Sequence, residues 1–219
     1  MPVSESDQAI SADRVSLRRP DGMIEAYAAF PRQARATTPG LVLVMDATGV
    51  DDHLRDVARR FAKAGYACIV PDLSARLESR KQTNGDLRAA ALYLLAKAPN
   101  CKIGVIGFGN GGNIALIQAL DNADVFDAAA TFYGSLKDIG PLDLHIPILA
   151  SYGEKDPAIS AEEVRVWRTA LRVPNDVRVY GSAGHAFFDE TRTSYVHSAA
   201  DDAWKRVLAF FKEHLGLES

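Results

Sequence analysis

One glycine-rich stretch organises the rest of the chain: Ile103-Gly104-Val105-Ile106-Gly107-Phe108-Gly109-Asn110-Gly111-Gly112-Asn113-Ile114. It fits two conflicting patterns. As G-x-G-x-x-G, with Gly107, Gly109 and Gly112, it matches the dinucleotide-binding fingerprint, in which backbone amides approach a pyrophosphate. As G-x-Nuc-x-G-G it is a nucleophile elbow, a tight turn from strand to helix that presents one reactive side chain. On the second interpretation the nucleophile position is Gly109, which has no side chain to react.

Length and composition predict one globular domain. The chain has 219 residues, of which 47% are hydrophobic, enough for one substantial core. We expect a flexible segment over residues 1–14 and a single domain over 15–219. The formal net charge of -3 and the scattered basic residues give no electrostatic footprint for nucleic acid. No run approaches the ~18 apolar residues of a membrane span, and the start lacks a signal-peptide pattern. We therefore expect a cytoplasmic protein that binds neither nucleic acid nor membrane.

The two cysteines predict no special chemistry. Cys68 and Cys101 both adjoin apolar runs, so we expect buried free thiols, with neither a disulfide framework nor a thiolate metal site. We expect no metal and no cofactor. The expected partner is a small-molecule substrate or ligand, bound by a monomer or a homodimer.

Hydrophobic patterning predicts a hairpin followed by alternating strands and helices. The expected strands cover residues 15–18, 23–30, 41–45, 66–70, 103–106, 128–133, 146–152 and 177–180. The expected helices lie between 51 and 65 and over 86–98, 113–120, 161–171 and 198–215. Pro20-Asp21-Gly22 supplies the turn of the hairpin. This order predicts an α/β fold with a mostly parallel sheet of about eight strands and helices on both faces.

Ligands of such sheets bind beyond the carboxyl ends of the strands, so the loops there are where chemistry is expected. Among these loops the glycine turn, Asp156 and His185 follow one another in the order nucleophile, acid, histidine, which is the α/β-hydrolase order. Taken alone, Asp156 before Pro157 fits a turn or cap, and His185 fits a loop histidine bonded to a carbonyl. Their joint placement favours a catalytic pair. The other histidines show no comparable pairing and are interpreted as surface or packing residues: His53, His145, His197 and His214.

The dinucleotide pattern meets its own requirements less well. It needs an acidic residue at the end of the next strand to bind the ribose hydroxyls. Here that strand ends Phe132-Tyr133-Gly134, and Asp124 and Asp127 precede it instead. Nucleotide binding through Gly107, Gly109 and Gly112 therefore stays as a third hypothesis.

From about Leu41 to the terminal helix the chain resembles the dienelactone hydrolases (carboxymethylenebutenolidases), which have the α/β-hydrolase fold. The ordered marks of this resemblance are Gly49-Val50, Leu54-Arg55-Asp56-Val57-Ala58, Gly65-Tyr66, Pro71-Asp72-Leu73-Ser74-Ala75-Arg76, Gly107 to Gly112, Tyr133-Gly134, Gly153-Glu154-Lys155-Asp156-Pro157, Gly184-His185-Ala186-Phe187 and Ser194-Tyr195-Val196-His197-Ser198-Ala199-Ala200. Each mark alone is weak, but the ordered set is specific.

The resemblance implies roles for individual residues. In that family a cysteine, sometimes a serine, attacks the carbonyl from the elbow; histidine activates it and aspartate orients the histidine. These supporting roles fall on His185 and Asp156, and the nucleophile position on Gly109. The backbone amides of Asn110 and Ala47 are implied as the oxyanion hole.

The resemblance also implies a substrate-binding set made of Asp46, Arg76, Tyr133 and Asp189. Asp46 takes the place of a carboxylate beside the resting thiol, and Arg76 that of an arginine that holds a substrate carboxylate. Asp189 stands where a second arginine is expected. A carboxylate there would repel an anionic substrate unless Arg192 compensates for it; the alternative is that Asp189 points to solvent.

Gly109 leaves the chemistry open, because covalent catalysis needs a side-chain nucleophile. The chain is an engineered knockout, a natural homologue in which His185 and Asp156 activate water directly, or a protein that has lost hydrolysis and kept a pocket. The sequence therefore predicts a hydrolase-like protein acting on a small ester, lactone or related acyl compound. The second hypothesis is a protein that binds or converts a small molecule without an acyl-enzyme.

Overall fold

The computed structural model describes residues 2–19, 21–44, 49–74 and 79–217. Within this part of the chain, the strands are β1 (Ile10–Arg19), β2 (Gly22–Pro31), β3 (Gly40–Val44), β4 (Ala67–Pro71), β5 (Ile103–Phe108), β6 (Ala128–Phe132), β7 (Ile148–Gly153) and β8 (Asn175–Tyr180). The helices are α1 (Asp52–Lys63), α2 (Arg80–Lys97), α3 (Asn110–Asp121), α4 (Ala161–Ala170) and α5 (His197–Leu215).

The strands form one sheet of eight in the order β1-β2-β4-β3-β5-β6-β7-β8. β2 pairs antiparallel with both β1 and β4, and all the remaining pairs are parallel. The carboxyl ends of β3 to β8 therefore meet at one edge of the sheet. The predicted fold class, a mostly parallel sheet behind an antiparallel start, is confirmed.

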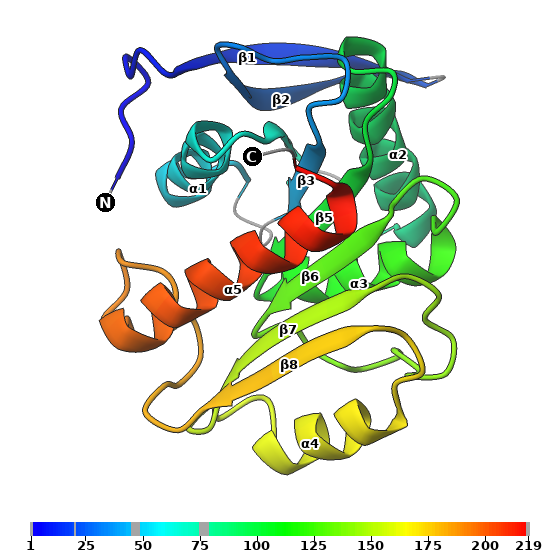
Figure 1. The fold of residues 1–219 in the computed structure, drawn as a ribbon. Coiled ribbons are helices and arrows are strands. Elements are labelled where there is room, and N and C mark those ends of the chain that lie inside the picture. The colour runs from blue at the N-terminus through cyan, green and yellow to red at the C-terminus, as the bar shows by residue number, and fades with distance from the viewer. Residues whose placement is uncertain (1, 20, 45–48, 75–78, 218–219) are drawn as a thin grey trace.

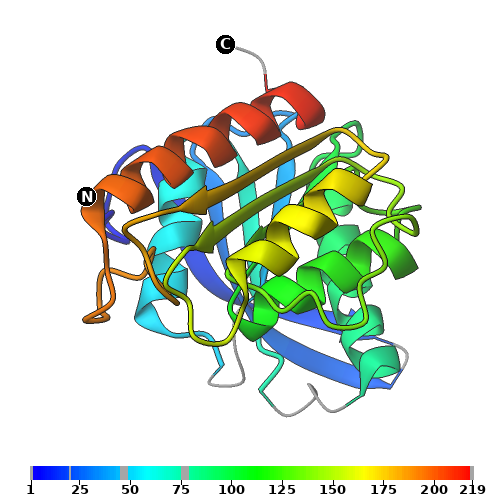
Figure 2. The same ribbon diagram turned by 90° about the horizontal axis from the view of Figure 1, so that it is seen from below.

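Helices cover both faces of this sheet (Figures 1 and 2). The apolar side chains of α1 and α5 pack in one core cluster, and those of α2, α3 and α4 pack in another on the opposite face. β3 shows why: Leu41 and Leu43 belong to the first cluster, and Val42 and Val44 to the second. A strand buried on both faces needs apolar residues at every position, as the unbroken run predicts.

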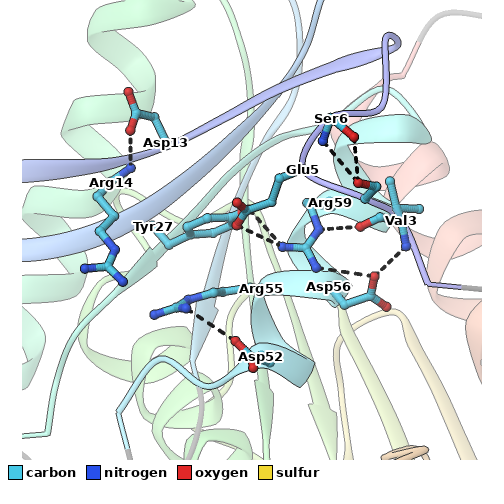
Figure 3. A network of polar contacts seen from close by, with 11 residues as sticks. Val3, Glu5, Ser6, Asp13, Arg14, Tyr27, Asp52, Arg55, Asp56 and Arg59 are labelled. Carbon is cyan, nitrogen blue, oxygen red and sulfur yellow. Dashed lines mark hydrogen bonds and ion pairs between the residues drawn. The ribbon is translucent and has the colours of Figure 1, made fainter.

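The first strand begins at Ile10 instead of Val15, so the expected boundary at residue 14 lies inside β1. Most of its side chains are exposed or half-buried, and they give no apolar alternation to read. The residues before it lie against α1. Figure 3 shows Val3 donating its N–H to Asp56 and accepting a hydrogen bond from Arg59.

Two helices begin earlier than predicted. α2 starts at Arg80 instead of Asp86, because Ser79 accepts a hydrogen bond from the amide of Gln82 and caps the helix. Gly85 lies inside α2 with open space beside it, so this glycine does not mark a helix end. α3 starts at Asn110 instead of Asn113, directly after the glycine turn.

The two thiols are free, Cys68 buried and Cys101 half-buried. Burial raises the pKa of both. In the part of the chain that the structure describes, no helix combines the length and the apolar character that crossing a membrane requires.

Candidate active site

Gly109 forms the turn between β5 and α3. Its backbone has φ +56° and ψ -126°, a conformation that side-chain-bearing residues rarely adopt. Its N–H donates to the carbonyl of Phe132 on β6, and its own carbonyl accepts from Gly112 in the first turn of α3. This is the strained strand-to-helix turn that an elbow requires.

The neighbouring glycines are needed for packing. A Cβ on Gly107 would overlap the carbonyl of Gly111, and one on Gly112 would lie 2.5 Å from the hydroxyl of Thr131. A Cβ on Gly134 would meet the same hydroxyl. The close approach of α3 to β5 and β6 therefore explains the glycine spacing without a pyrophosphate.

Asp156 and His185 lie side by side beyond the ends of β7 and β8. Nδ1 of His185 is 2.7 Å from Oδ2 of Asp156, whose side chain is completely buried. The other carboxylate oxygen accepts from the amides of Ala158 at 2.8 Å and Ile159 at 3.2 Å. Because Asp156 is held by its own loop, it can fix the orientation of the imidazole, which is 42% exposed.

A cavity of about 140 Å³ lies beside this pair, and its walls are Phe108, Gly109, Tyr133, His185, Ala186, Asp189 and Arg192. Four of the predicted site residues thus line one cavity. Tyr133 and Ala186 have φ angles of +43° and +56°. Non-glycine residues in this region carry backbone strain, which clusters at functional sites. The Tyr133 ring lies 5.2 Å from that of His185, and burial raises the pKa of its hydroxyl.

Three predicted site residues, Asp46, Ala47 and Arg76, lie outside the described residues. Their implied roles stay predictions. Asn110, the other predicted oxyanion donor, is the first residue of α3, where amides have no intrahelical partner. Among the described residues, no cluster of three or more His, Cys, Asp or Glu side chains could hold a metal ion.

Asp189 does not point to solvent: its side chain is only 5% exposed. One carboxylate oxygen accepts from the amide of Thr191 at 2.9 Å and from its hydroxyl at 2.7 Å. The other lies 3.3 Å from Nε of Arg192. Arg192 therefore compensates the negative charge of Asp189 through an ion pair, as the binding of an anionic ligand would require.

His53 is the site residue that the sequence interpretation missed. Its side chain is 3% exposed, and Nδ1 lies 3.4 Å from Oδ1 of Asp189. Its ring meets Phe108 and Phe188 edge-on, both at 6.3 Å between centroids. The sequence did contain one indication of this: His53 comes shortly after β3, so it lies at the same edge of the sheet as His185.

Asp189 is expected to make stability depend on pH. Burial raises its pKa, but the hydrogen bonds from Thr191 and Arg192 and the electrostatic interaction with His53 lower it more, so the net pKa is below the ordinary value. A carboxylate with a depressed folded-state pKa stabilises the protein above its unfolded pKa near 3.9, and this is lost as pH falls through the folded pKa.

Asp189→Asn should therefore lower the free energy of unfolding by about 1 kcal/mol at pH 7 and by much less near pH 3, as measured by urea denaturation. Asp52→Asn is the matched control, because the Asp52 side chain is 99% exposed. An Asp189→Asn penalty that is the same at both pH values would contradict the assignment.

Comparison with known proteins places this geometry in a family. The model of the "Dienelactone hydrolase family" matches residues 24–215. A protein of Escherichia coli (strain K12) named "Putative carboxymethylenebutenolidase" is 32% identical over 252 aligned positions, which cover 99% of this chain and 92% of the relative. A Bradyrhizobium protein named "Probable 2-oxo-3-(5-oxofuran-2-ylidene)propanoate lactonase" is 29% identical, and the alignment covers 87% of this chain and 89% of that relative.

A solved structure agrees. The crystal structure titled as a "Putative Dienelactone Hydrolase" from Klebsiella pneumoniae subsp. pneumoniae MGH 78578 has a TM-score of 0.85 and 31% identity. The match covers 94% of this chain and 100% of that one. Family model, relatives of nearly full length and fold all agree, and the chain belongs to the dienelactone hydrolase family.

Proposed function

We propose that this protein hydrolyses a small ester, lactone or related acyl compound with a water molecule that His185 activates beside Gly109. The supporting observation is the His185–Asp156 pair, joined at 2.7 Å, next to a cavity from which the elbow side chain is missing. Hydrolysis of this bond class rests on membership of the family. The direct attack by water rests on Gly109, because no side chain there can form an acyl-enzyme.

The proposed chemistry uses the two imidazole nitrogens differently. Asp156 holds the proton on Nδ1, so Nε2 carries the lone pair and acts as the general base. Nε2 takes a proton from water as the water oxygen bonds to the acyl carbon. The carbonyl becomes a tetrahedral oxyanion, which the amide of Asn110 would stabilise. When the ester bond breaks, Nε2–H returns the proton to the leaving oxygen, which gives an acid and an alcohol.

Lactones are the favoured substrates within this class. The name of the Bradyrhizobium relative is "Probable 2-oxo-3-(5-oxofuran-2-ylidene)propanoate lactonase", and that of the Escherichia coli relative is "Putative carboxymethylenebutenolidase". A cavity of about 140 Å³ suits a small acyl group or ring. The Asp189–Arg192 ion pair in its wall neutralises the carboxylate that would otherwise repel an acidic substrate.

The alternative is a protein that binds or converts a small molecule without hydrolysis. The same observation motivates it, since Gly109 removes the group that forms the covalent intermediate. The two functions differ in whether any ester or lactone is turned over in a reaction that needs His185.

His185→Ala should lower kcat/KM for a hydrolysed lactone or aryl ester by about 10²- to 10⁴-fold, because the general base is lost. Steady-state assays on a panel of small lactones and p-nitrophenyl esters measure this. His145→Ala is the matched control, since His145 is exposed and remote from the cavity. A panel without turnover, or turnover that His185→Ala leaves unchanged, would overturn the proposal.

A further inference from the structure

A second and larger cavity, of about 340 Å³, lies between α1, the N-terminal half of α5 and the loop before α5. We name it the Trp204 groove, after the side chain that forms its wall together with Arg60, Lys63, Phe188, Tyr195 and His197. Figure 2 shows the two helices side by side on the same face of the sheet. The groove shares no lining residue with the cavity beside Gly109, and the Phe188 ring, stacked on Phe108 at 5.6 Å, separates the two.

The Ser194 to Ala200 segment contributes Tyr195, His197 and Ala200 to this groove. This segment is one of the sequence motifs that carry the family resemblance, but the chemistry proposed at His185 does not involve it. Val3 also lines the groove, and it is held against α1 by hydrogen bonds to Asp56 and from Arg59 (Figure 3). The volume of the groove falls in the range of small-molecule sites, about 300–1,000 Å³.

Trp204 and Arg60 form the centre of the wall. The Arg60 guanidinium carbon lies 4.4 Å from the centroid of the Trp204 ring and 5.7 Å from that of Phe188. The ring of Phe61 also packs against the indole, at 4.6 Å between ring centroids. A stacked guanidinium uses its flat face for the ring and keeps its in-plane N–H donors for another partner.

The charges of the groove leave Arg60 uncompensated. Lys63 pairs with Asp7 at 2.8 Å, and Asp201 pairs with Lys205 at 2.6 Å. Across the described part of the chain, no hydrogen bond or ion pair reaches the Arg60 side chain. The remaining acidic residue, Glu190, is exposed at the rim, where it disfavours a second negative charge on a ligand.

We propose that the Trp204 groove binds a small amphiphilic monocarboxylate. The carboxylate pairs with Arg60, and the apolar body lies against Trp204 and Tyr195. Planar pairing of guanidinium with carboxylate gives the selectivity for an acid over its neutral amide. The site is independent of hydrolysis at His185.

Titration of the full chain with 3-phenylpropionate and with 3-phenylpropanamide tests this, by calorimetry and by tryptophan fluorescence. We expect a dissociation constant of about 1 mM or tighter for the acid, and binding of the amide at least about tenfold weaker. Trp204→Phe should remove the fluorescence change, because the other tryptophan, Trp167, is buried on α4.

Arg60→Gln should weaken binding of the acid about tenfold or more. Arg88→Gln, which removes the same charge from a surface pair with Asp124, should leave it unchanged. His185→Ala should also leave it unchanged, because the cavity beside Gly109 is a different site.

The proposal fails if no binding is seen up to about 10 mM. It also fails if the acid and the amide bind equally. A third contrary result is an Arg60→Gln protein that melts like the parent and binds the acid as tightly as Arg88→Gln does. Loss of binding in His185→Ala would place the ligand in the other cavity. If sedimentation shows a dimer that does not bind the acid, the groove is occupied by a second copy of the chain and the proposal is wrong. None of these outcomes bears on hydrolysis, so the two proposals can fail separately.

Discussion

Gly109→Cys is expected to give a protein that is acylated by an activated ester. The turn at Gly109 already has the φ of +56° that places a side chain at the tip of an elbow. His185 and Asp156 remain joined beside it, so a thiol at this position has a base to deprotonate it. Intact mass after exposure to p-nitrophenyl acetate should show one added acetyl group, formed as the thiolate displaces p-nitrophenolate.

Three controls isolate the thiol at residue 109. The parent protein reports on the native thiols, which react slowly because burial raises the pKa of Cys68 and Cys101. Gly109→Ala carries the same backbone strain, about 1–3 kcal/mol, without a nucleophile. Gly109→Cys with His185→Ala removes the base. If the folded Gly109→Cys protein acquires no more label than the parent, the machinery around the turn is not that of a hydrolase.

The proximity of Asp156 and His185 was predictable because neighbouring parallel strands end at the same edge of the sheet. β7 and β8 are neighbours, with Gly153 opposite Tyr180, so the loops that begin there run beside each other. A reader of the sequence needs only the strands and the alternation of apolar runs to place Asp156 and His185 together. The same argument places Gly109 near them, since β5 and β6 precede β7 in the sheet.

The pairing of Asp189 with Arg192 was one alternative that the sequence offered, but the burial of Asp189 and its contact with His53 were not predictable in the same way. Asp189, in the loop between β8 and α5, is buried because Thr191 and Arg192 fold back on it and His53 approaches from α1. No periodic pattern in the sequence indicates the contact between Asp189 and His53, which lie far apart in the chain. The first half of β1 was missed for a related reason, since its pairing with β2 is made by the backbone and leaves most of its side chains exposed or half-buried.

The glycine stretch shows how one pattern serves two interpretations. Gly107 and Gly112 are fixed by close contacts with Gly111 and Thr131, so they would be glycine in any elbow of this shape. Gly109 differs from them in its backbone, which has a φ of +56° at the tip of the turn. Gly109 completes the G-x-G-x-x-G pattern, and on the proposed function it stands where the family resemblance implies a nucleophile. The contacts of Gly107 and Gly112 are explained by packing without a nucleotide.

Asp156→Asn is expected to lower kcat about 10³- to 10⁴-fold while leaving the fold intact. Oδ1 of Asp156 accepts hydrogen bonds from the amides of Ala158 and Ile159, so the oxygen of an asparagine must face those donors. Its NH₂ group then faces Nδ1 of His185. Nδ1 becomes an acceptor, the proton moves to Nε2, and the nitrogen that should activate water has no lone pair.

Three measurements separate this tautomer effect from a structural one. Thermal unfolding should show a small change for Asp156→Asn, because the side chains have the same shape and the Ala158 and Ile159 bonds survive. Asp143→Asn, at an exposed position, should keep the parent rate. ¹⁵N spectra of the imidazole should show a proton on Nδ1 of His185 in the parent and on Nε2 in the variant. A variant with the parent tautomer and the parent rate would show that Asp156 only caps its loop, and His185 would then need another residue to orient it.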